Sequence, residues 1–315
     1  MAMDAVRLTR RMGASMSSSP RVSLVTPSLN QGRFLEAALR SVHDQGYPEL
    51  EHVVMDGGST DGSADILARW ADRLSACESA PDGGMYDALQ RGFLRTTGEV
   101  MGWLNADDLH APWTLSLVGD LFARFPQIEW LTTLYPILWD EQGHAVHIGY
   151  GGAFNARAFA RGHNLYGAPW SVGGFVQQES TFWRRSLWER AGGRIDASLR
   201  LAGDFELWAR FFHHAPLWAV AAPIAGFRRH GEQKTAREMD VYRAEAEQVL
   251  RRDGFRRPHP LRGFLRRNLR RAFGGRPLVR MPAPLGRGLT RLGLVLPAPV
   301  CWWRDGWELR TDYVL

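Results

Sequence analysis

The chain has 315 residues, enough for one large domain or two smaller ones, and 45% of them are hydrophobic. Its two cysteines, Cys77 and Cys301, exclude a disulfide framework and fit a reducing compartment. Every apolar run falls short of the roughly 20 residues that a membrane-spanning helix needs, and residues 1–20 lack the apolar core of a secretory signal. These features predict a cytoplasmic protein.

In chain order, residues 1–20 end in a Ser-Pro-rich stretch and predict a disordered lead-in. After it, short apolar runs alternate with segments whose apolar residues recur at helical spacing. The predicted strands are 22–25, 52–55 and 99–104. The predicted helices are 33–45, a segment capped by Ser59 or Thr60, 84–95, and a segment that follows Pro112.

This alternation, with short glycine-rich connections, predicts an α/β fold with a mostly parallel sheet and helices on both faces. After residue 128 the order is looser, with strands near 128–134 and 144–149 and helices at 184–191 and 202–213. We expect a nucleotide-binding half (21–110) and an acceptor half (111–235) that share one sheet.

Polar clusters follow three of the predicted strands, where ligands of open α/β sheets bind. They are 26–30 (Thr-Pro-Ser-Leu-Asn), 56–61 (Asp-Gly-Gly-Ser-Thr-Asp) and 105–108 (Asn-Ala-Asp-Asp). An isolated carboxylate such as Asp61 is often a helix cap. Three clusters on one edge of a sheet instead favour a binding site.

Asp107 and Asp108 emerge together from the end of a buried strand. Adjacent carboxylates raise each other's pKa unless a positive charge lies between them. A hard divalent cation such as Mg²⁺ or Mn²⁺ supplies that charge and can also hold a diphosphate. The alternative is one capping and one solvated aspartate ahead of the helix that follows Pro112.

Four phrases together resemble glycosyltransferase family 2, in order and in spacing. They are V-T-P-S-L-N-Q-G-R-F-L (25–35), V-V-M-D-G-G-S-T-D-G-S (53–63), P-D-G-G-M-Y-D-A-L (81–89) and G-E-V-M-G-W-L-N-A-D-D (98–108). The resemblance covers about residues 20–235. Within the family, the sequence is similar to the branch that builds O-antigen, capsule and exopolysaccharide. It implies a GT-A fold and an inverting, metal-dependent sugar transfer.

For the donor side, the resemblance implies a nucleotide pocket lined by Thr26, Pro27 and Ser28, with Asp56 on the base. Further donor contacts are implied for Asp82 and Tyr86. The 105–108 cluster resembles the D-x-D region, where one aspartate ligates the metal and its neighbour meets the ribose. Asn105 can hydrogen-bond a ribose but adds no charge, so metal binding is expected from Asp107 and Asp108, with His230 as a further ligand.

For the acceptor side, residues 201–208 resemble the family's E-D-x-D-L-W segment, with Asp204 at the position of the general base. Gly203 replaces the preceding glutamate, and Glu206 stands for the later aspartate as a second acid. Gln178 and Glu179, in the segment before this helix, are expected to face the acceptor or the sugar. The alternative for Asp204 is a carboxylate that only stabilises the helix dipole.

Residues 236–315 are expected to form a basic helical extension. Residues 251–291 hold thirteen arginines and one acid, a net charge of +12, which leaves −6 for the rest of the chain's +6. Residues 261–273 predict an amphipathic helix suited to an anionic membrane surface, on the inner face of the plasma membrane. The alternative is a solvated face docked on the domain; no nucleic-acid reading module accompanies the charge.

The sequence thus predicts transfer of a sugar from a nucleotide-sugar donor, with a UDP-sugar favoured, to a glycan or lipid-linked acceptor in cell-surface polysaccharide synthesis. One rival, a sugar nucleotidyltransferase, would need a basic glycine-rich signature, and residues 26–32 contain neither lysine nor arginine. A second rival is a catalytically silent scaffold at the membrane surface. The clustered carboxylates Asp56, Asp107, Asp108 and Asp204 argue against it.

Overall fold

The computed structural model describes residues 19–152, 154–166, 174–231, 238–252, 268, 271, 278–292 and 294–314. The lead-in predicted for residues 1–20 falls almost entirely outside these ranges, and so does the amphipathic helix predicted for residues 261–273. Among the described residues, no helix combines the length and the apolar content needed to cross a bilayer.

Ten strands in the described ranges form one sheet, in the spatial order β12-β14-β13-β10-β6-β9-β4-β1-β2-β3. In chain order they are β1 (Val22–Ser28), β2 (Leu50–Asp56), β3 (Ala76–Ser79), β4 (Val100–Trp103), β6 (Trp130–Thr133), β9 (Phe182–Arg184), β10 (Trp218–Val220), β12 (Leu278–Val279), β13 (Leu296–Trp303) and β14 (Trp307–Val314). The β3-β2-β1-β4 half is parallel throughout. β9 is antiparallel to both of its neighbours, β4 and β6.

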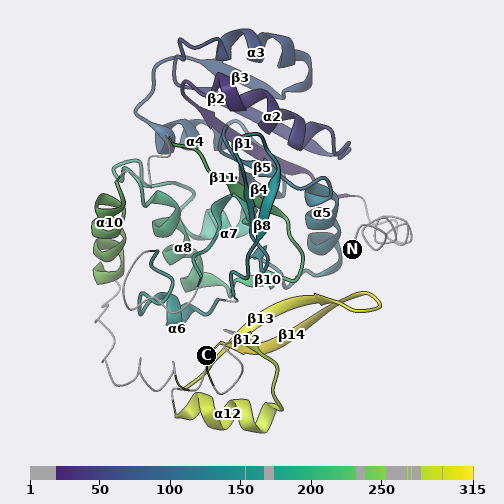
Figure 1. Cartoon of the computed structure of the whole chain (residues 1–315), viewed down its shortest axis with the longest axis vertical. Helices are drawn as coiled ribbons and strands as arrows, with labels where there is room; N and C mark the ends of the chain where they lie inside the picture. Colours follow the sequence, from purple (N-terminus) through teal and green to yellow (C-terminus); the bar gives the residue numbers. More distant parts are fainter. Residues whose placement is uncertain are drawn as a thin grey trace.

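Helices pack on both faces of this sheet. The helices longer than one turn are α2 (Gly32–His43), α3 (Ser63–Trp70), α4 (Met85–Phe93), α5 (Thr114–Arg124), α7 (Arg185–Arg190), α8 (Gly203–His214), α10 (Met239–Arg252) and α12 (Ala283–Arg291). Residues of α4, α8 and α10 share one apolar cluster, and α5 belongs to the cluster on the opposite face. Figure 1 shows α8 and α10 on one side of the strands and α5 on the other.

A second sheet of four strands in the described ranges has the order β5-β11-β7-β8. It comprises β5 (Leu109–His110), β7 (Ile137–Trp139), β8 (Ala145–Ile148) and β11 (Ala225–Arg228). β5 directly follows the 105–108 cluster, and β11 pairs with it antiparallel, with Gly226 opposite Leu109. This pairing brings residues 228–230 close to the end of β4, although about 120 residues of chain separate the two segments.

The periodicity in the sequence correctly predicted β1, β2 and β4 and the helices α2 to α5, α7 and α8. In α2, for example, the predicted apolar residues form the buried face. The helical extension predicted for 236–315 is only partly right: α10 and α12 are helical, whereas β13 and β14 form a hairpin. β13 joins the sheet by pairing parallel to β10, at Ala219–Val300 and Val220–Cys301.

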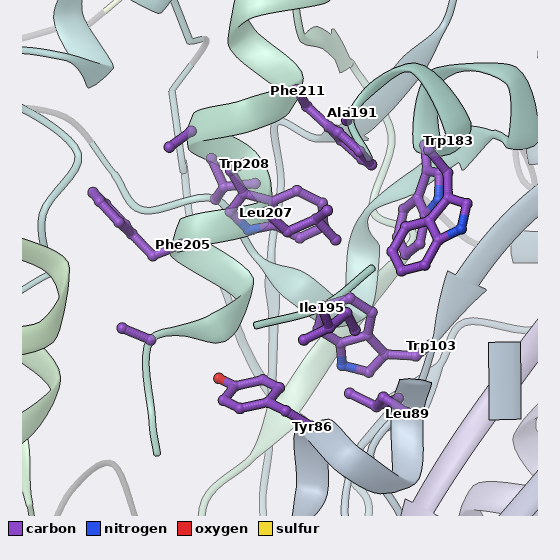
Figure 2. Packing of buried hydrophobic residues seen from close by; sticks show 14 of the residues in the cluster. Tyr86, Leu89, Trp103, Trp183, Ala191, Ile195, Phe205, Leu207, Trp208 and Phe211 are labelled. Carbon is purple, nitrogen blue, oxygen red and sulfur yellow. The ribbon is translucent and has the colours of Figure 1, made fainter. Parts of the chain in front are cut away.

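Four tryptophans lie at the centre of the core that joins β4 to α8. Trp208 of α8 stacks on Trp103 of β4, with ring centroids 5.8 Å apart and planes 9° apart. Trp208 also stacks on Trp130, and Trp183 of β9 meets Trp208 edge-on. All four are at most 1% exposed, and Figure 2 shows Trp208, Trp103 and Trp183 converging from their separate elements. These rings serve packing and do not line a sugar-binding cleft.

Trp208→Ala should lower the free energy of unfolding by about 3–5 kcal/mol, because it removes a fully buried ring and leaves a cavity. Equilibrium unfolding in urea measures this loss. Leu94→Ala is the control: Leu94 is 76% exposed, and its substitution should change the stability by less than about 0.5 kcal/mol. A Trp208→Ala protein as stable as the control would contradict a role for the tryptophan cluster in stability.

Candidate active site

The three polar clusters predicted from the sequence meet at one edge of the sheet. β1 lies between β2 and β4. Ser28, the last residue of β1, is opposite Asp56, the last residue of β2. On the other side, Val25 pairs with Trp103, so the 105–108 loop begins beside the end of β1. The carboxyl ends of these parallel strands therefore form a single polar edge.

Asp56 is held rigidly at this edge. It is 2% exposed, and its carboxylate accepts hydrogen bonds from the backbone N–H of Ser59 (2.9 Å), from the Ser59 hydroxyl (2.5 Å) and from the Ser79 hydroxyl (2.6 Å). The neighbouring Ser28 hydroxyl is buried and has no hydrogen-bond partner among the described residues. An unsatisfied polar atom of this kind fits a polar ligand such as a nucleotide.

Thr26 faces away from the polar edge. Its Oγ1 lies 2.9 Å from Nε2 of His52, and Nδ1 of His52 lies 3.0 Å from Nε2 of His43. Burial holds the pKa of His52 well below its ordinary value, so this chain of side chains is uncharged. Pro27 is buried in the same strand. Both residues can therefore contribute backbone and shape to a nucleotide pocket, and the Thr26 hydroxyl is already bound.

The two residues predicted on the donor side from 81–89 are placed differently. Asp82 is partly exposed and lies against the turn at Gly57, where an added Cβ would be 3.0 Å from its Oδ2. Tyr86 is buried and donates its hydroxyl to the carbonyl oxygen of Leu201, at 2.8 Å. Its ring covers Gly203, whose Cβ, if present, would be 2.7 Å from it. Tyr86 thus fixes the start of α8 instead of facing a donor.

Asp107 and His230 form the most prominent pair at the end of β4. Asp107 Oδ2 lies 3.0 Å from His230 Nε2. The Asp107 side chain is partly exposed, and that of His230 is buried. Phe34 of α2 supports this region, since its ring lies 4.7 Å from the His230 ring and 4.8 Å from the Arg228 guanidinium. An anionic and an imidazole ligand are therefore presented together, with arginine beside them.

Asp108 has a different role from that of its neighbour. Its Oδ1 accepts a hydrogen bond from the backbone N–H of Arg228 (3.0 Å) and its Oδ2 accepts one from Asn105 (3.1 Å). Burial raises the pKa of this carboxyl well above its ordinary value, and the nearby Asp107 and Glu179 raise it further. Asp108 therefore ties the 105–108 loop to β11, and its predicted metal ligation stays a prediction.

Within the described residues, no three His, Cys, Asp or Glu side chains are grouped so that they could hold a metal ion. Metal binding by Asp107, Asp108 and His230 stays a prediction. Asn105 donates its amide to Asp108 and to Gln178 (3.0 Å), which leaves its buried Oδ1 without a partner among the described residues.

Gln178 does not face an acceptor. It lies in the 3₁₀ turn η2 (Gln178–Ser180), donates to the carbonyl oxygen of Trp103 at 2.6 Å and accepts from Asn105. Both ends of its amide are used inside the protein. Gln178 therefore braces the end of β4 under the 105–108 loop, which corrects its predicted acceptor-side position.

Asp204 lies in the first turn of α8 and is half-buried. Burial is the main cause that raises the pKa of its carboxyl to about 6, and the charge of Glu245 adds to it; hydrogen bonding to its own and the Phe205 backbone N–H groups opposes the shift. Its Oδ1 has no partner among the described residues. A carboxylate with a pKa near neutrality and a free oxygen is suited to accept a proton.

Glu179 connects the two sides of the site electrostatically. It is 5% exposed, and its Oε1 has no partner among the described residues. Burial raises the pKa of Glu179 to about 7, and the charges of both Asp204 and Asp107 contribute to the increase. Glu179 therefore lies close enough to both carboxylates for their charges to affect its pKa, and its position facing the acceptor or the sugar stays a prediction.

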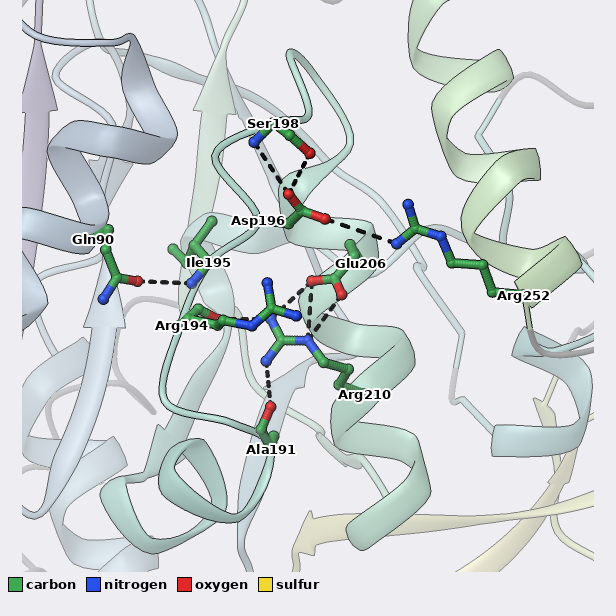
Figure 3. A network of polar contacts seen from close by, with 9 residues as sticks. All are labelled: Gln90, Ala191, Arg194, Ile195, Asp196, Ser198, Glu206, Arg210 and Arg252. Atoms are coloured by element: carbon green, nitrogen blue, oxygen red, sulfur yellow. Dashed lines mark hydrogen bonds and ion pairs between the residues drawn. The ribbon is translucent and has the colours of Figure 1, made fainter.

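Glu206, predicted as a second acid, is paired within the protein. Its carboxylate accepts from Nε of Arg210 at 2.9 and 3.0 Å and from Nη2 at 2.8 Å. Arg210 also donates to the carbonyl oxygens of Ala191 and Arg194. Figure 3 shows this network joining α8 to the loop that precedes it. Glu206 is thus a structural residue, and the prediction of an acceptor-side acid is corrected.

The sequence analysis missed Glu245 of α10. Its carboxylate accepts hydrogen bonds from three successive backbone N–H groups that precede Asp204, those of Arg200 (2.8 Å), Leu201 (2.9 Å) and Ala202 (2.9 Å). The buried face of α10, formed by Tyr242, Ala246, Val249 and Leu250, has helical spacing and could have predicted the helix. No local signal marks Glu245 within it.

Solved structures identify the fold. Residues 1–349 of TarS from S. aureus, in complex with UDP-GlcNAc, superimpose with a TM-score of 0.54 at 14% identity, over 73% of this chain and 70% of that one. The mannosyltransferase PcManGT from Pyrobaculum calidifontis, in complex with GDP-Man and Mn²⁺, gives a TM-score of 0.52 at 20% identity, over 82% and 73%. With the parallel half-sheet and its polar edge, these likenesses define a GT-A fold.

Sequence comparison finds similarity to one family over part of the chain. Residues 23–135 match the model of glycosyl transferase family 2. An uncharacterised glycosyltransferase of Mycobacterium tuberculosis is 36% identical over 94 residues, 30% of this chain and 36% of the relative's length. A PGL/p-HBAD biosynthesis glycosyltransferase of Mycobacterium bovis is 27% identical over 204 residues, 64% of this chain and 73% of the relative. Over residues 23–135 the chain is similar to glycosyltransferase family 2, and it spans about a third of the length of the first of these relatives.

The raised pKa of Asp204 predicts a pH-dependent stability. Between about pH 4 and 6 the unfolded state has lost this proton while the folded state keeps it, so ionisation lowers the stability of the wild type as the pH rises. Asp204→Asn removes the cost. The variant should be more stable than the wild type by about 2–3 kcal/mol at about pH 7.5, and the difference should vanish near pH 4.

Urea unfolding of both proteins across this pH range measures the difference. Asp65→Asn, at an exposed position of α3, is the control and should follow the wild type. A constant difference between Asp204→Asn and the wild type from pH 4 to 7.5 would contradict a raised pKa at Asp204.

Proposed function

We propose that the protein transfers a sugar from a nucleotide-sugar donor, with a UDP-sugar favoured, to a hydroxyl of a glycan or lipid-linked acceptor, with inversion at the anomeric carbon. The observation that carries this proposal is the presence of two unlike groups whose charges both act on the buried Glu179. One is the Asp107–His230 pair at the end of β4; the other is the protonatable Asp204 at the start of α8. UDP-GlcNAc and GDP-Man in the structural neighbours support a nucleotide-sugar donor.

The residues at the end of β4 fit a divalent cation. Asp107 Oδ2 and His230 Nε2 are 3.0 Å apart, so both could contact one ion that also binds the phosphates of the donor. The Mn²⁺ in the PcManGT structure supports Mg²⁺ or Mn²⁺ here. Asp107 and His230 would hold the ion, which when bound neutralises the charge on the diphosphate leaving group.

The protein's own groups account for the remaining steps. Asp56 and the open Ser28 hydroxyl are positioned to bind the nucleoside, and Asn105 can meet the ribose. Asp204 takes the proton from the acceptor hydroxyl as its oxygen attacks the anomeric carbon. The bond from that carbon to the diphosphate oxygen breaks, and its electron pair leaves with the nucleoside diphosphate. Attack from the side opposite the leaving group inverts the anomeric configuration.

The charge of +12 on residues 251–291 supports an acceptor at an anionic membrane surface, and therefore a lipid-linked sugar and a role in cell-surface polysaccharide synthesis. Membrane attachment of this kind needs no spanning helix, since a basic segment can bind anionic headgroups reversibly.

Binding of nucleoside diphosphates tests the donor side. UDP, GDP and dTDP are titrated calorimetrically into the wild type and Asp107→Ala, with and without Mn²⁺. We expect one nucleotide to bind in a Mn²⁺-dependent manner, and Asp107→Ala to weaken that binding roughly tenfold or more. Asp65→Asn controls for the loss of a carboxylate. Absence of binding to every nucleotide, together with tight binding to anionic vesicles, would support the silent scaffold instead.

Turnover tests the base. Asp204→Asn should lower kcat by roughly 100-fold or more, with little change in donor binding, because general-base catalysis contributes on that scale. Nucleoside diphosphate release from the donor identified by calorimetry measures this. Glu206→Gln is the matched control on the same helix: it should lose stability through its pair with Arg210 and keep kcat within about threefold. Retained anomeric configuration in the product, read by NMR, would exclude the single-base mechanism.

A further inference from the structure

Helix α8 begins without a capping side chain of its own. Its N-cap residue is Ala202, which offers no hydrogen-bond acceptor. The turn before it is held instead by Glu245 of α10, whose two carboxylate oxygens accept from the N–H groups of Arg200, Leu201 and Ala202 at 2.8–2.9 Å. Charge-assisted hydrogen bonds of this kind are roughly twice as strong as neutral ones. A distant helix therefore holds the turn that leads into α8.

Further contacts from α4 and from both ends of α10 hold this turn and the loop before it. Leu201 is held at both ends of its backbone, with its N–H on Glu245 and its carbonyl oxygen on the Tyr86 hydroxyl of α4. Arg200 pairs with Glu238, just before α10, at 2.6 Å. At the far end of α10, Arg252 lies 3.8 Å from Asp196, as Figure 3 shows. α10 is thus attached along its length to the loop that leads into α8.

We propose that Glu245 is a positioning residue for the reaction: it sets the place and the electrostatics of Asp204, and α10 is part of the catalytic unit. This inference rests on the proposed role of Asp204 as the base. Asp204 is two residues beyond the last N–H group that Glu245 binds, so a shift of this turn moves the carboxylate directly. A displacement of about 1 Å of a reacting group can cost 100-fold in rate.

A purely structural role would leave the ionisation of Asp204 unchanged, and the pH profile separates the two. The titratable groups that affect Asp204, or are affected by it, are Tyr86 of α4, Tyr242 and Glu245 of α10, and Glu179 of η2. Burial keeps both tyrosines neutral, because it raises the pKa of each well above its ordinary value. The negative charge of Glu245 raises the pKa of Asp204, so its removal should move the acid limb of kcat to lower pH.

The test is Glu245→Gln in the full chain, with Mn²⁺. The probe is the donor that the wild type hydrolyses fastest among UDP-GlcNAc, UDP-glucose and GDP-mannose. Release of the nucleoside diphosphate from this donor is measured across the pH range. We expect kcat to fall roughly 10-fold to 100-fold, KM for the nucleotide sugar to stay within about twofold, and the acid limb to move to lower pH. Asp240→Asn, at a 98% exposed side chain of the same helix, should match the wild type.

Wild-type kcat and an unmoved acid limb in a folded Glu245→Gln protein would overturn the inference. A fall in kcat with an unmoved limb would also overturn it, because that is the result of a structural role alone. Failure of the proposed function is recognised separately, since Asp204→Asn would then retain activity or the wild type would hydrolyse none of the three donors.

If Glu245→Gln fails to fold, Glu245→Asp is the variant that tests the positioning role. It keeps the charge, but its shorter side chain cannot reach all three N–H groups. Because the charge is kept, the acid limb is not the readout for this variant, and the ratio of kcat to donor KM is used instead. The expected result is a lower kcat with the donor KM within about twofold; wild-type kcat, or kcat and KM impaired together as in a general loss of structure, would overturn the inference.

Discussion

The relative position of the two sides of the candidate site, the end of β4 and the start of α8, depends on buried indole rings. Trp103 is two residues before Asn105, at the end of β4, and Trp208 is one helical turn beyond Asp204 in α8. Because their rings stack face to face in the core, the end of β4 and the start of α8 cannot move apart without opening a cavity. The buried aromatic rings thus serve to hold these two elements in register.

Carboxylates at the site differ by what already occupies their oxygens. The carboxylate of Asp108 accepts hydrogen bonds from Asn105 and the Arg228 backbone, and that of Glu206 accepts from Arg210. Asp204 and Glu179, in contrast, each have an oxygen with no partner among the described residues. Sequence motifs singled out all four of these acids. They could not assign the roles, because each deciding partner arrives from a segment far away in the chain or across a helical turn, and its approach is set by packing.

Which elements of the fold could be predicted likewise depended on whether they are determined by local sequence or by distant segments of the chain. β1, β2 and the helix α2 were predictable, because a run of buried residues or a 3.6-residue period is visible within one segment. β9 was not: it has three residues, and its place between β4 and β6 is a matter of strand pairing. β13 contains two prolines and follows an arginine-rich region, so its composition suggested an extension outside the sheet.

The hairpin of β13 and β14 has a consequence for how the chain acquires its fold. β10 lies in the interior of the sheet only because β13 pairs along its outer side. During synthesis, the segments up to β11 leave the ribosome about 70 residues before β13 does. Until then β10, whose Ala219 and Val220 are fully buried in the complete fold, is an open strand edge, a form prone to pairing with other chains. Chaperone binding to the nascent chain would therefore be needed most in that interval.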